Sequence, residues 1–259
     1  MNPELSIIIP FSEKRIENLK QTIRFLLKDE ITKKSELILV CQTYFEKINT
    51  SGFISIEHIN LESDVYCRSK MCNLGVEKSK AKKIALLDSD RVLPKEYFSH
   101  VCSTINLNQC ITTKNLWQIS HPVSDLDIEN EKYDAFPDQR SLKNEMHKKG
   151  SFSGNTMLFK NLYVSVGGMD ESFLGYGYQD IDFSRTMINN GVEMVFLEEK
   201  EIHLYHTKNF TEAKKSTIEN GIKYCEKWNL KPEKLLIEKG NSVGIDVMKI
   251  LKQKKIKIL

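Results

Sequence analysis

Apolar residues in the first hundred positions follow two alternating patterns: short continuous runs, and a spacing of three or four. The run at residues 5–10 (LSIIIP) is rich in β-branched side chains, which is typical of a strand covered on both faces. The apolar positions after it recur at the spacing that predicts one face of an amphipathic helix. They are Ile16, Leu19, Ile23 and Leu26.

The alternation continues as far as residue 88. It predicts strands at residues 36–40, 55–59 and 84–87, and a helix over 71–80. Strands that alternate with helices are typical of a doubly wound sheet. We therefore expect an α/β fold with a mostly parallel central sheet and flanking helices.

Residues 120–150 show neither pattern. They contain an acidic run, two proline steps and a basic stretch that ends at Gly150. A loop of this length inside a compact domain is usually functional or mobile. We expect a long loop here.

Regular patterns return after residue 152. They are a strand over 155–159, a short helix to 166, a helix over 180–190, strand-like runs at 192–197 and 201–206, and Lys-rich helices beyond 210. Gly191 suits the left-handed residue that often ends a helix. We expect a single domain over 1–210 and a Lys-rich helical C-terminal extension over 211–259.

The composition fits a folded globular protein without a dominant charge. The 259 residues include 38 Lys or Arg and 35 Asp or Glu, so the net charge is +3. A nucleic-acid binder usually carries a pronounced basic face, so we expect no nucleic-acid partner. Six cysteines lack any C-x-x-C pair and are expected to be reduced thiols. The opening residues predict neither a signal peptide nor a spanning helix, so we expect a soluble cytoplasmic protein.

The strongest local motif is Asp88-Ser89-Asp90, which follows the predicted strand at 84–87. In an extended segment, residues two apart point the same way, so both carboxylates can face one ligand. Ligands of open α/β sheets bind beyond the carboxyl ends of strands, where this triplet lies. Two carboxylates suit Mg²⁺ or Mn²⁺ with a substrate diphosphate, although a solvated turn explains the same three residues.

A second motif, GYGYQDID, places Tyr176 between Gly175 and Gly177 just before a predicted helix. Glycines permit tight turns and close approach to a ligand, and Tyr176 offers a flat face to a sugar ring. Asp180 and Asp182 are two positions apart on a helix, so one can face a cleft while the other caps. Stabilisation of the helix N-terminus explains the acids but not the glycine–aromatic spacing.

His203 and His206 end the last strand-like run. Imidazole is a common ligand for Mn²⁺-type ions, so one of these histidines could join Asp90. A structural role is the alternative for a histidine pair. The order of the three motifs favours a metal site, because together they serve one chemical purpose.

These motifs resemble the nucleotide-sugar glycosyltransferases of GT-A fold, most closely the β-1,4-galactosyltransferase family and related bacterial family-two enzymes. The resemblance extends roughly over residues 6–206. The blocks that carry it are IIIPF, YCRSKMCNLGV, IALLDSDRVLP, FSGNTMLF, GGMDESFLGYGYQDIDFSRTM and HLYH. It implies a Rossmann-like GT-A domain, with residues 1–100 as its nucleotide-binding half and 101–210 as its acceptor-binding and catalytic half.

The resemblance implies a UDP-sugar donor site and a divalent cation, Mn²⁺ or Mg²⁺. The matching donor positions are Pro10, Phe11, Arg15, Tyr66, Arg68, Asp88, Ser89 and Asp90. The implied metal ligands are Asp90 and His206, together with His203, which replaces a methionine ligand.

The resemblance also implies an acceptor side, with Asp180 at the position of the general base. The positions matched to the acceptor or the sugar are Ser151, Gly154, Tyr176, Gly177, Gln179 and Asp182. Tyr176 stands where the animal enzymes have Trp, and Gln179 replaces an acid that binds the acceptor. We therefore expect a different acceptor.

The implied function is an inverting, metal-dependent transfer of a hexose or N-acetylhexosamine from a UDP-sugar to a glycan or lipid-linked glycan. Residues 120–150 would fold over the donor as a lid. The missing membrane anchor and disulfides fit a bacterial enzyme of surface polysaccharide synthesis, in the cytoplasm or at the inner face of the membrane. The tail MKILKQKKIKIL suits either peripheral contact with an anionic membrane or a solvated helix.

Two other functions stay open. A retaining N-acetylgalactosaminyltransferase-like enzyme shares the D-x-D and glycine–aromatic pattern, but Asp180 argues against it. An inactive nucleotide- or sugar-binding module is disfavoured by intact Asp90, Asp180 and His206. By resemblance, Ser151 replaces an aromatic near carbon two of the donor; a small side chain there admits an acetamide, which favours UDP-GalNAc over UDP-galactose.

Overall fold

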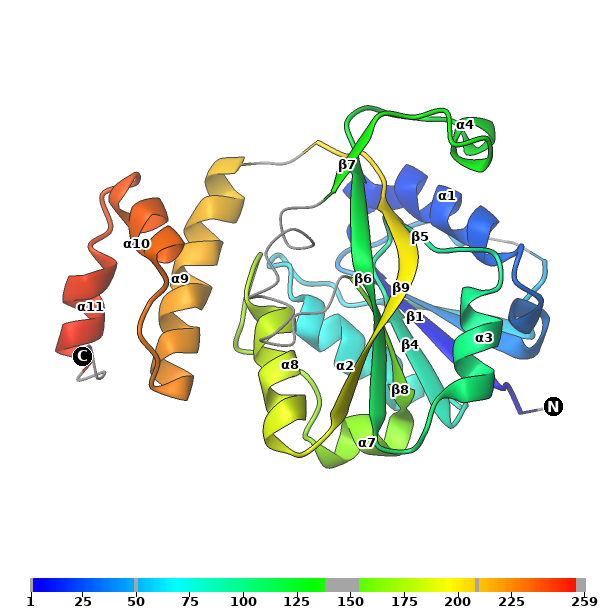
Figure 1. Ribbon diagram of the computed structural model, residues 1–259, viewed down its shortest axis with the longest axis horizontal. Coiled ribbons are helices and arrows are strands. Elements are labelled where there is room, and N and C mark those ends of the chain that lie inside the picture. Colours follow the sequence, from blue (N-terminus) through cyan, green and yellow to red (C-terminus); the bar gives the residue numbers. More distant parts are fainter. Residues whose placement is uncertain (1, 49–50, 138–153, 208–209, 255–259) are drawn as a thin grey trace.

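The computed structural model describes residues 2–48, 51–137, 154–207 and 210–254. At its centre is a sheet with the strand order β3-β2-β1-β4-β8-β6-β9-β5, and β7 pairs with β6 (Figure 1). Helices cover both faces of this sheet, and the last three helices lie to one side of it (Figure 1). This is the layered α/β arrangement that the alternating patterns predict.

The first four strands are parallel and correspond to the predicted runs. They are β1 (Leu5–Phe11), β2 (Ser35–Cys41), β3 (Ser55–Asn60) and β4 (Lys83–Leu87). β1 is central, because Leu5 pairs with Ser35 of β2 on one side and with Lys83 of β4 on the other. Parallel strands end at one edge of a sheet, so the loops after β1 and β4 start close together.

β1 is buried along its whole length, and its alternate side chains enter two different cores. Ile7 and Ile9 belong to one core, with α1 and α3, whereas Ile8 belongs to the other, with α2, α7 and α8. In the first core, α1 spans Ile16–Leu26 and α3 spans Tyr97–Thr104. In the second, the helices are α2 (Arg68–Lys78), α7 (Lys160–Ser165) and α8 (Gln179–Asn189). The two-sided burial explains why β1 is a continuous apolar run in the sequence.

The second half of the sheet is mixed. β8 (Asn155–Phe159) lies antiparallel between β4 and β6 (Gln109–Ile119), and β9 (Glu193–His203) runs parallel to β6. The short β5 (Arg91–Val92) pairs antiparallel with the end of β9. The predicted bounds of β8 are confirmed, whereas β9 is one strand where the sequence predicts two runs.

The sequence pattern does not predict β6, because polar side chains interrupt its apolar positions. Thr112 and Thr113 are both buried, and each forms a hydrogen bond inside the sheet. Thr112 Oγ1 donates to the Asn155 carbonyl at 2.7 Å, and Thr113 Oγ1 donates to the Glu201 carboxylate. Tertiary partners satisfy these hydroxyls, and sequence periodicity does not reveal them.

The stretch after β6 is more regular than predicted. A short helix, α4 (Asp125–Glu129), and a strand, β7 (Ala135–Pro137), lie within the stretch expected to be one loop. The side chain of Ser124 caps α4, and Asp125 pairs with Arg24 of α1. The expectation of an uninterrupted loop is therefore wrong for this part, and residues 138–150 lie outside the described residues.

The C-terminal extension consists of α9 (Phe210–Trp228), α10 (Lys234–Asn241) and α11 (Val247–Gln253). These helices share an apolar cluster that includes Ile218, Ile222, Cys225, Leu236, Val247 and Leu251. The apolar residues of α11 that lie in this cluster face inward, not toward a membrane. Among the described residues, no helix is long and apolar enough to cross a membrane.

Asp182 connects α8 to the extension. Its Oδ1 accepts a hydrogen bond from Trp228 Nε1 at 2.7 Å, and its Oδ2 lies 2.8 Å from Lys227 Nζ. Lys227 Nζ also lies 2.8 Å from Asp170 Oδ2, but that carboxylate is much more exposed. The side chain of Asp182 is only 2% exposed, so this contact belongs to the interior of the protein.

We expect Asp182→Ala to lower the free energy of unfolding by about 1–3 kcal/mol, because Trp228 Nε1 loses its buried acceptor. The matched change Asp170→Ala removes the exposed partner of the same lysine and should cost less than about 1 kcal/mol. Urea unfolding of both variants measures the difference. Equal losses would contradict a structural role specific to Asp182.

Candidate functional site

The D-S-D triplet leaves the end of β4 and is fixed by backbone hydrogen bonds from two other strands. Asp88 N–H donates to the Gly154 carbonyl, just before β8, at 2.8 Å. Leu204 N–H, just after β9, donates to the Asp90 carbonyl at 2.9 Å. The pairing of β5 with β9 continues this contact, so the sheet itself brings the triplet to the late histidines.

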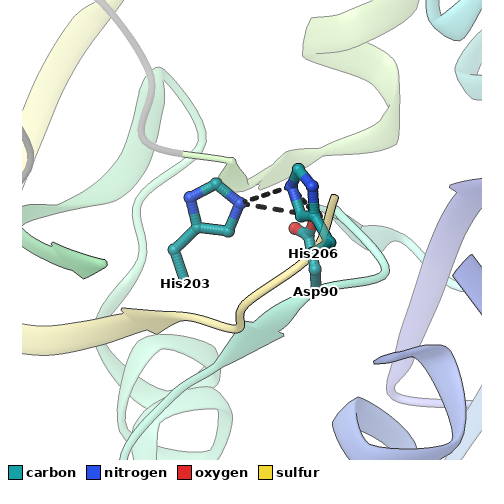
Figure 2. A group of neighbouring side chains, drawn as sticks. All are labelled: Asp90, His203 and His206. Atoms are coloured by element: carbon teal, nitrogen blue, oxygen red, sulfur yellow. Dashed lines mark hydrogen bonds and ion pairs between the residues drawn. The ribbon is translucent and has the colours of Figure 1, made fainter. Parts of the chain in front are cut away.

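Asp90, His203 and His206 converge on one point (Figure 2). Asp90 Oδ2 lies 3.4 Å from His203 Nε2 and 3.2 Å from His206 Nε2, and the two Nε2 atoms are 3.1 Å apart. Asp90 and His203 are buried. The structure thus brings together all three residues that the sequence predicts as metal ligands.

The donor set and its spacing fit a divalent cation. An ion about 2.1 Å from each of three ligands at right angles would separate those ligands by about 3.0 Å. The observed separations of 3.1, 3.2 and 3.4 Å are close to that value. A carboxylate with two imidazoles suits Mn²⁺ better than Mg²⁺, which prefers oxygen ligands and water.

The protonation states also suit metal binding. Burial, with the nearby Arg91 charge, lowers the pKa of His203 to about 4, so its imidazole is neutral at neutral pH. Burial would raise the pKa of Asp90, but His203, a hydrogen bond from His206 and Arg91 together hold it well below its usual value. A neutral imidazole beside an ionised carboxylate is the state in which both bind a cation.

Arg68, the first residue of α2, links two carboxylates that the sequence predicts in the site, those of Asp88 and Asp180. Its Nε lies 2.7 Å from Asp88 Oδ1, and its Nη1 lies 2.8 Å from Asp180 Oδ1. Burial would lower the pKa of Arg68, but Asp180 and Asp88 raise it well above its usual value. The guanidinium is therefore a fixed cation between the D-S-D triplet and the start of α8.

A second buried arginine belongs to the site, although the sequence motifs do not point to it. Arg91 Nη2 lies 3.7 Å from Asp88 Oδ2, and Arg91 Nε lies 3.4 Å from Asp90 Oδ1 and 3.6 Å from Glu201 Oε1. Glu201 is fully buried on β9. The only sequence signal for Arg91 was that a basic residue directly follows D-S-D. Glu201 gave no signal, because it is remote in sequence and contacts Arg91 only in the folded chain.

Gly154 makes room for this arginine. A Cβ there would lie 2.6 Å from Arg91 Nε, and its φ of +118° is a conformation that favours glycine. The resemblance predicts a sugar or acceptor contact at Gly154, whereas the structure shows it against Arg91. Ser151, the predicted donor-selecting residue, lies outside the described residues.

Three further predicted residues interact electrostatically with one another or with Asp90. Arg15, Tyr66 and Tyr176 come from η1 (Glu13–Arg15), the approach to α2 and the glycine turn. Burial lowers the pKa of Arg15, while Asp90, Tyr66 and Tyr176 act on it in the opposite direction. Arg15 is therefore within electrostatic reach of each of the other three residues. Tyr176 is 51% exposed.

Other predicted contacts lie within the protein. Phe11 is buried in the core, where its ring meets Phe45 edge-on with centroids 4.7 Å apart, and Pro10 is buried beside it in β1. Gln179 is buried and donates from Nε2 to the Gly175 carbonyl at 2.9 Å. Asp182 is held by α9 in the same way. The side chains of Phe11, Gln179 and Asp182 therefore all have partners inside the protein, and their ligand contacts stay predictions from the resemblance.

A hollow of about 660 Å³ lies beside this site, between α1 and residues 122–126. It is lined by Asn18, Gln21 and Tyr205, among others, and not by the D-S-D carboxylates. Asn18 Nδ2 donates to the Tyr205 carbonyl at 3.0 Å, so this wall supports the segment between the two histidines.

Comparison with known proteins connects this geometry to one class. The sequence model for the N-terminal domain of galactosyltransferase matches residues 139–209, about a quarter of the chain, which include the glycine turn, Asp180 and both histidines. No curated protein sequence matches the chain significantly.

Several solved structures share the fold. The mannosyltransferase PcManGT from Pyrobaculum calidifontis, solved with GDP-Man and Mn²⁺, has a TM-score of 0.58 and 10% identity over 98% of this chain and 74% of that chain. GalNAc-T7, solved with UDP, GalNAc and Mn²⁺, has a TM-score of 0.59 and 10% identity over 97% of this chain and 56% of that chain. Drosophila beta1,4-galactosyltransferase 7, solved with xylobiose, has a TM-score of 0.51 and 13% identity over 83% of this chain and 79% of that chain.

The chain has the GT-A fold of nucleotide-sugar glycosyltransferases, as the sequence predicts. The galactosyltransferase match over the glycine turn and the late histidines supports a glycosyltransferase.

We expect Asp90→Ala and His206→Ala each to weaken Mn²⁺-dependent binding of UDP by at least about tenfold, because each removes one of three converging ligands. Calorimetry with UDP, with and without Mn²⁺, measures this. His100→Ala, which changes an exposed histidine of α3, is the matched control and should bind as the unmodified chain does. Unchanged metal dependence in both site variants would rule out the metal site.

Proposed function

We propose that the protein is an inverting, metal-dependent glycosyltransferase that moves a hexose or N-acetylhexosamine from a UDP-sugar to a hydroxyl of a glycan. The observation that carries this proposal is the convergence of Asp90, His203 and His206 within 4.8 Å, with Arg68 linking Asp88 to Asp180. Asp88, two residues before Asp90, and Asp180, the proposed base, both contact this guanidinium, which supports a role for all three in one site.

The donor side would be formed by Arg15, Tyr66 and Arg68, which lie around the D-S-D triplet. Asp90, His203 and His206 would hold the cation, which supplies positive charge to the departing diphosphate when it is bound. Arg68 adds a planar set of donors on the same side, and its ion pair with Asp88 keeps it oriented.

Asp180 would act as the general base. The acceptor hydroxyl gives its proton to the Asp180 carboxylate while its oxygen bonds to the anomeric carbon, and the bond from that carbon to UDP breaks with its electrons. Attack from the face opposite UDP inverts the anomeric configuration. Because Arg68 contacts both Asp88 and Asp180, the donor side and the base share one positioning residue.

The fold alone does not distinguish an inverting enzyme from a retaining one. Asp180 favours inversion, because an inverting transfer needs a base where this carboxylate lies, beside Arg68 and near the glycine turn. The alternative of an inactive binding module is disfavoured because the three candidate metal ligands converge and Arg68 joins the base candidate to the D-S-D triplet.

The donor is proposed to be UDP-GalNAc, on the small side chain of Ser151. The site is proposed to serve a cytoplasmic enzyme of bacterial surface polysaccharide synthesis, with a glycan or lipid-linked acceptor at the inner face of the membrane. Peripheral contact through the Lys-rich tail is the less supported part, because Val247 and Leu251 of α11 pack inward.

We expect Asp180→Asn to lower kcat for transfer at least about 100-fold, because the amide keeps the shape but cannot accept the proton. UDP binding in the presence of Mn²⁺ should change by less than about threefold. Initial-rate kinetics and calorimetry on the same variant separate the two effects. A variant that kept more than about a tenth of kcat would not support Asp180 as the base.

A screen of UDP-sugars for Mn²⁺-dependent hydrolysis tests the proposed function without an acceptor. We expect kcat/KM to favour UDP-GalNAc over UDP-galactose by about 10-fold or more, and Ser151→Tyr to remove that preference by crowding the acetamide. Ser151→Ala is the matched control, because it keeps the side chain small and removes only the hydroxyl. A preference for galactose would overturn the donor assignment. In a separate reaction with a glycan acceptor, an α-anomeric transfer product by NMR would overturn inversion.

A further inference from the structure

The glycine turn is held from behind by α9 of the C-terminal extension. Asn220 of α9 is 3% exposed, and its Nδ2 donates to the carbonyls of Leu174 at 2.8 Å, Gly177 at 2.9 Å and Tyr176 at 3.3 Å. One buried amide therefore contacts three carbonyls of the turn. A buried side-chain amide in such contacts fixes the backbone that it reaches.

Other residues of α9 lie directly against the same turn. Tyr176 N–H donates to Ser216 Oγ at 3.0 Å. A Cβ on Gly175 would lie 2.7 Å from Ser216 Cβ, and one on Gly177 would lie 3.1 Å from Thr217 Oγ1. The glycine spacing that the sequence shows is thus required by the close approach of α9 as well as by positive φ angles.

On its other side the turn faces the candidate site. Gly175 N–H donates to the Tyr66 carbonyl at 2.8 Å, and Tyr176 interacts electrostatically with Arg15, as Tyr66 and Asp90 do. Tyr176 is half exposed there, whereas its backbone is bonded to α9. The position of this aromatic ring at the site therefore depends on α9.

The start of α8 is held in the same way. Tyr178, the residue before the helix, has a φ of 67°, a left-handed conformation that is uncommon for a bulky side chain. Its ring packs on Tyr224 of α9 with centroids 5.4 Å apart, and a Cβ on Gly221 would lie 2.9 Å from its Cε2. A strained residue of this kind persists because its surroundings hold it.

We infer that Asn220 is a positioning residue, which holds the Gly175–Gly177 turn so that Tyr176 meets the sugar ring. On this inference, which rests on the proposed function, α9 is the rear wall of the sugar site. The C-terminal extension then belongs to the active site and is not an appendage to it.

The test compares Asn220→Ala with the matched control Glu219→Ala, an exposed neighbour on α9. We expect Asn220→Ala to raise the KM for Mn²⁺-dependent UDP-GalNAc hydrolysis about tenfold. UDP binding should change by less than about twofold, because UDP lacks the N-acetylhexosamine ring that Tyr176 would contact. Tyr176→Ala should have a similar effect. If Asn220 acts through Tyr176, the double variant should be no worse than Tyr176→Ala alone.

Hydrogen exchange of the amides at residues 174–178 gives a readout that needs no substrate. We expect exchange there to be at least tenfold faster in Asn220→Ala and unchanged in Glu219→Ala. Ser216→Ala, which removes the acceptor of the Tyr176 N–H and leaves Asn220 in place, gives a second variant if Asn220→Ala fails to fold.

Unchanged exchange in both turn variants, additive kinetic effects in the double variant, or an equal loss of UDP and UDP-GalNAc binding would each overturn the inference. Absence of metal-dependent turnover of any UDP-sugar by the unmodified protein would instead reject the proposed function. The exchange measurement would still decide whether Asn220 holds the turn.

Discussion

The carboxylates at the end of β4, the buried Asp90 and the partly buried Asp88, need cations beside them, and the structure provides two arginines. Asp88 contacts both Arg68 and Arg91, Asp90 contacts Arg91, and the fully buried Glu201 lies against the same guanidinium. An unpaired charge at such depth would cost several kcal/mol, so the arginines make the acidic site compatible with a folded protein. The position of β5 against β9, and of Gly154 against Arg91, follows from this packing.

The N-terminal half of the fold is predictable from the sequence because three of its strands, β1, β2 and β4, are covered on both faces. Such a strand is apolar at nearly every position, with Ser6 the exception in β1, and its run is visible without knowing its neighbours. β6 is different, because Thr112 and Thr113 are buried against Asn155 and Glu201, which lie far along the chain. Periodicity reports solvent exposure, and it fails where polar side chains are buried with distant partners.

The candidate site also has a part that was predictable from the sequence and a part that was not. The cluster of Asp90, His203 and His206 was predictable, because metal-binding residue types recur in a known order. Arg91 and Glu201 were not, since an ion pair between adjacent strands leaves no local pattern. The surroundings of Gln179 and Asp182 were not predictable for a related reason: their motif places them at the start of α8, but only the packing of the turn and of α9 shows that their side chains point inward.

The pairing of β5 with β9 has a consequence for folding. Asp90 comes from the first half of the sheet, and His203 and His206 come from the end of the second half. The three ligands are therefore assembled only when both halves have docked, and an unfolded chain has no equivalent site. Any ion held there binds the native state selectively, so its concentration contributes directly to the folding equilibrium. Occupancy of this site is then a measure of whether the two halves of the sheet are correctly joined.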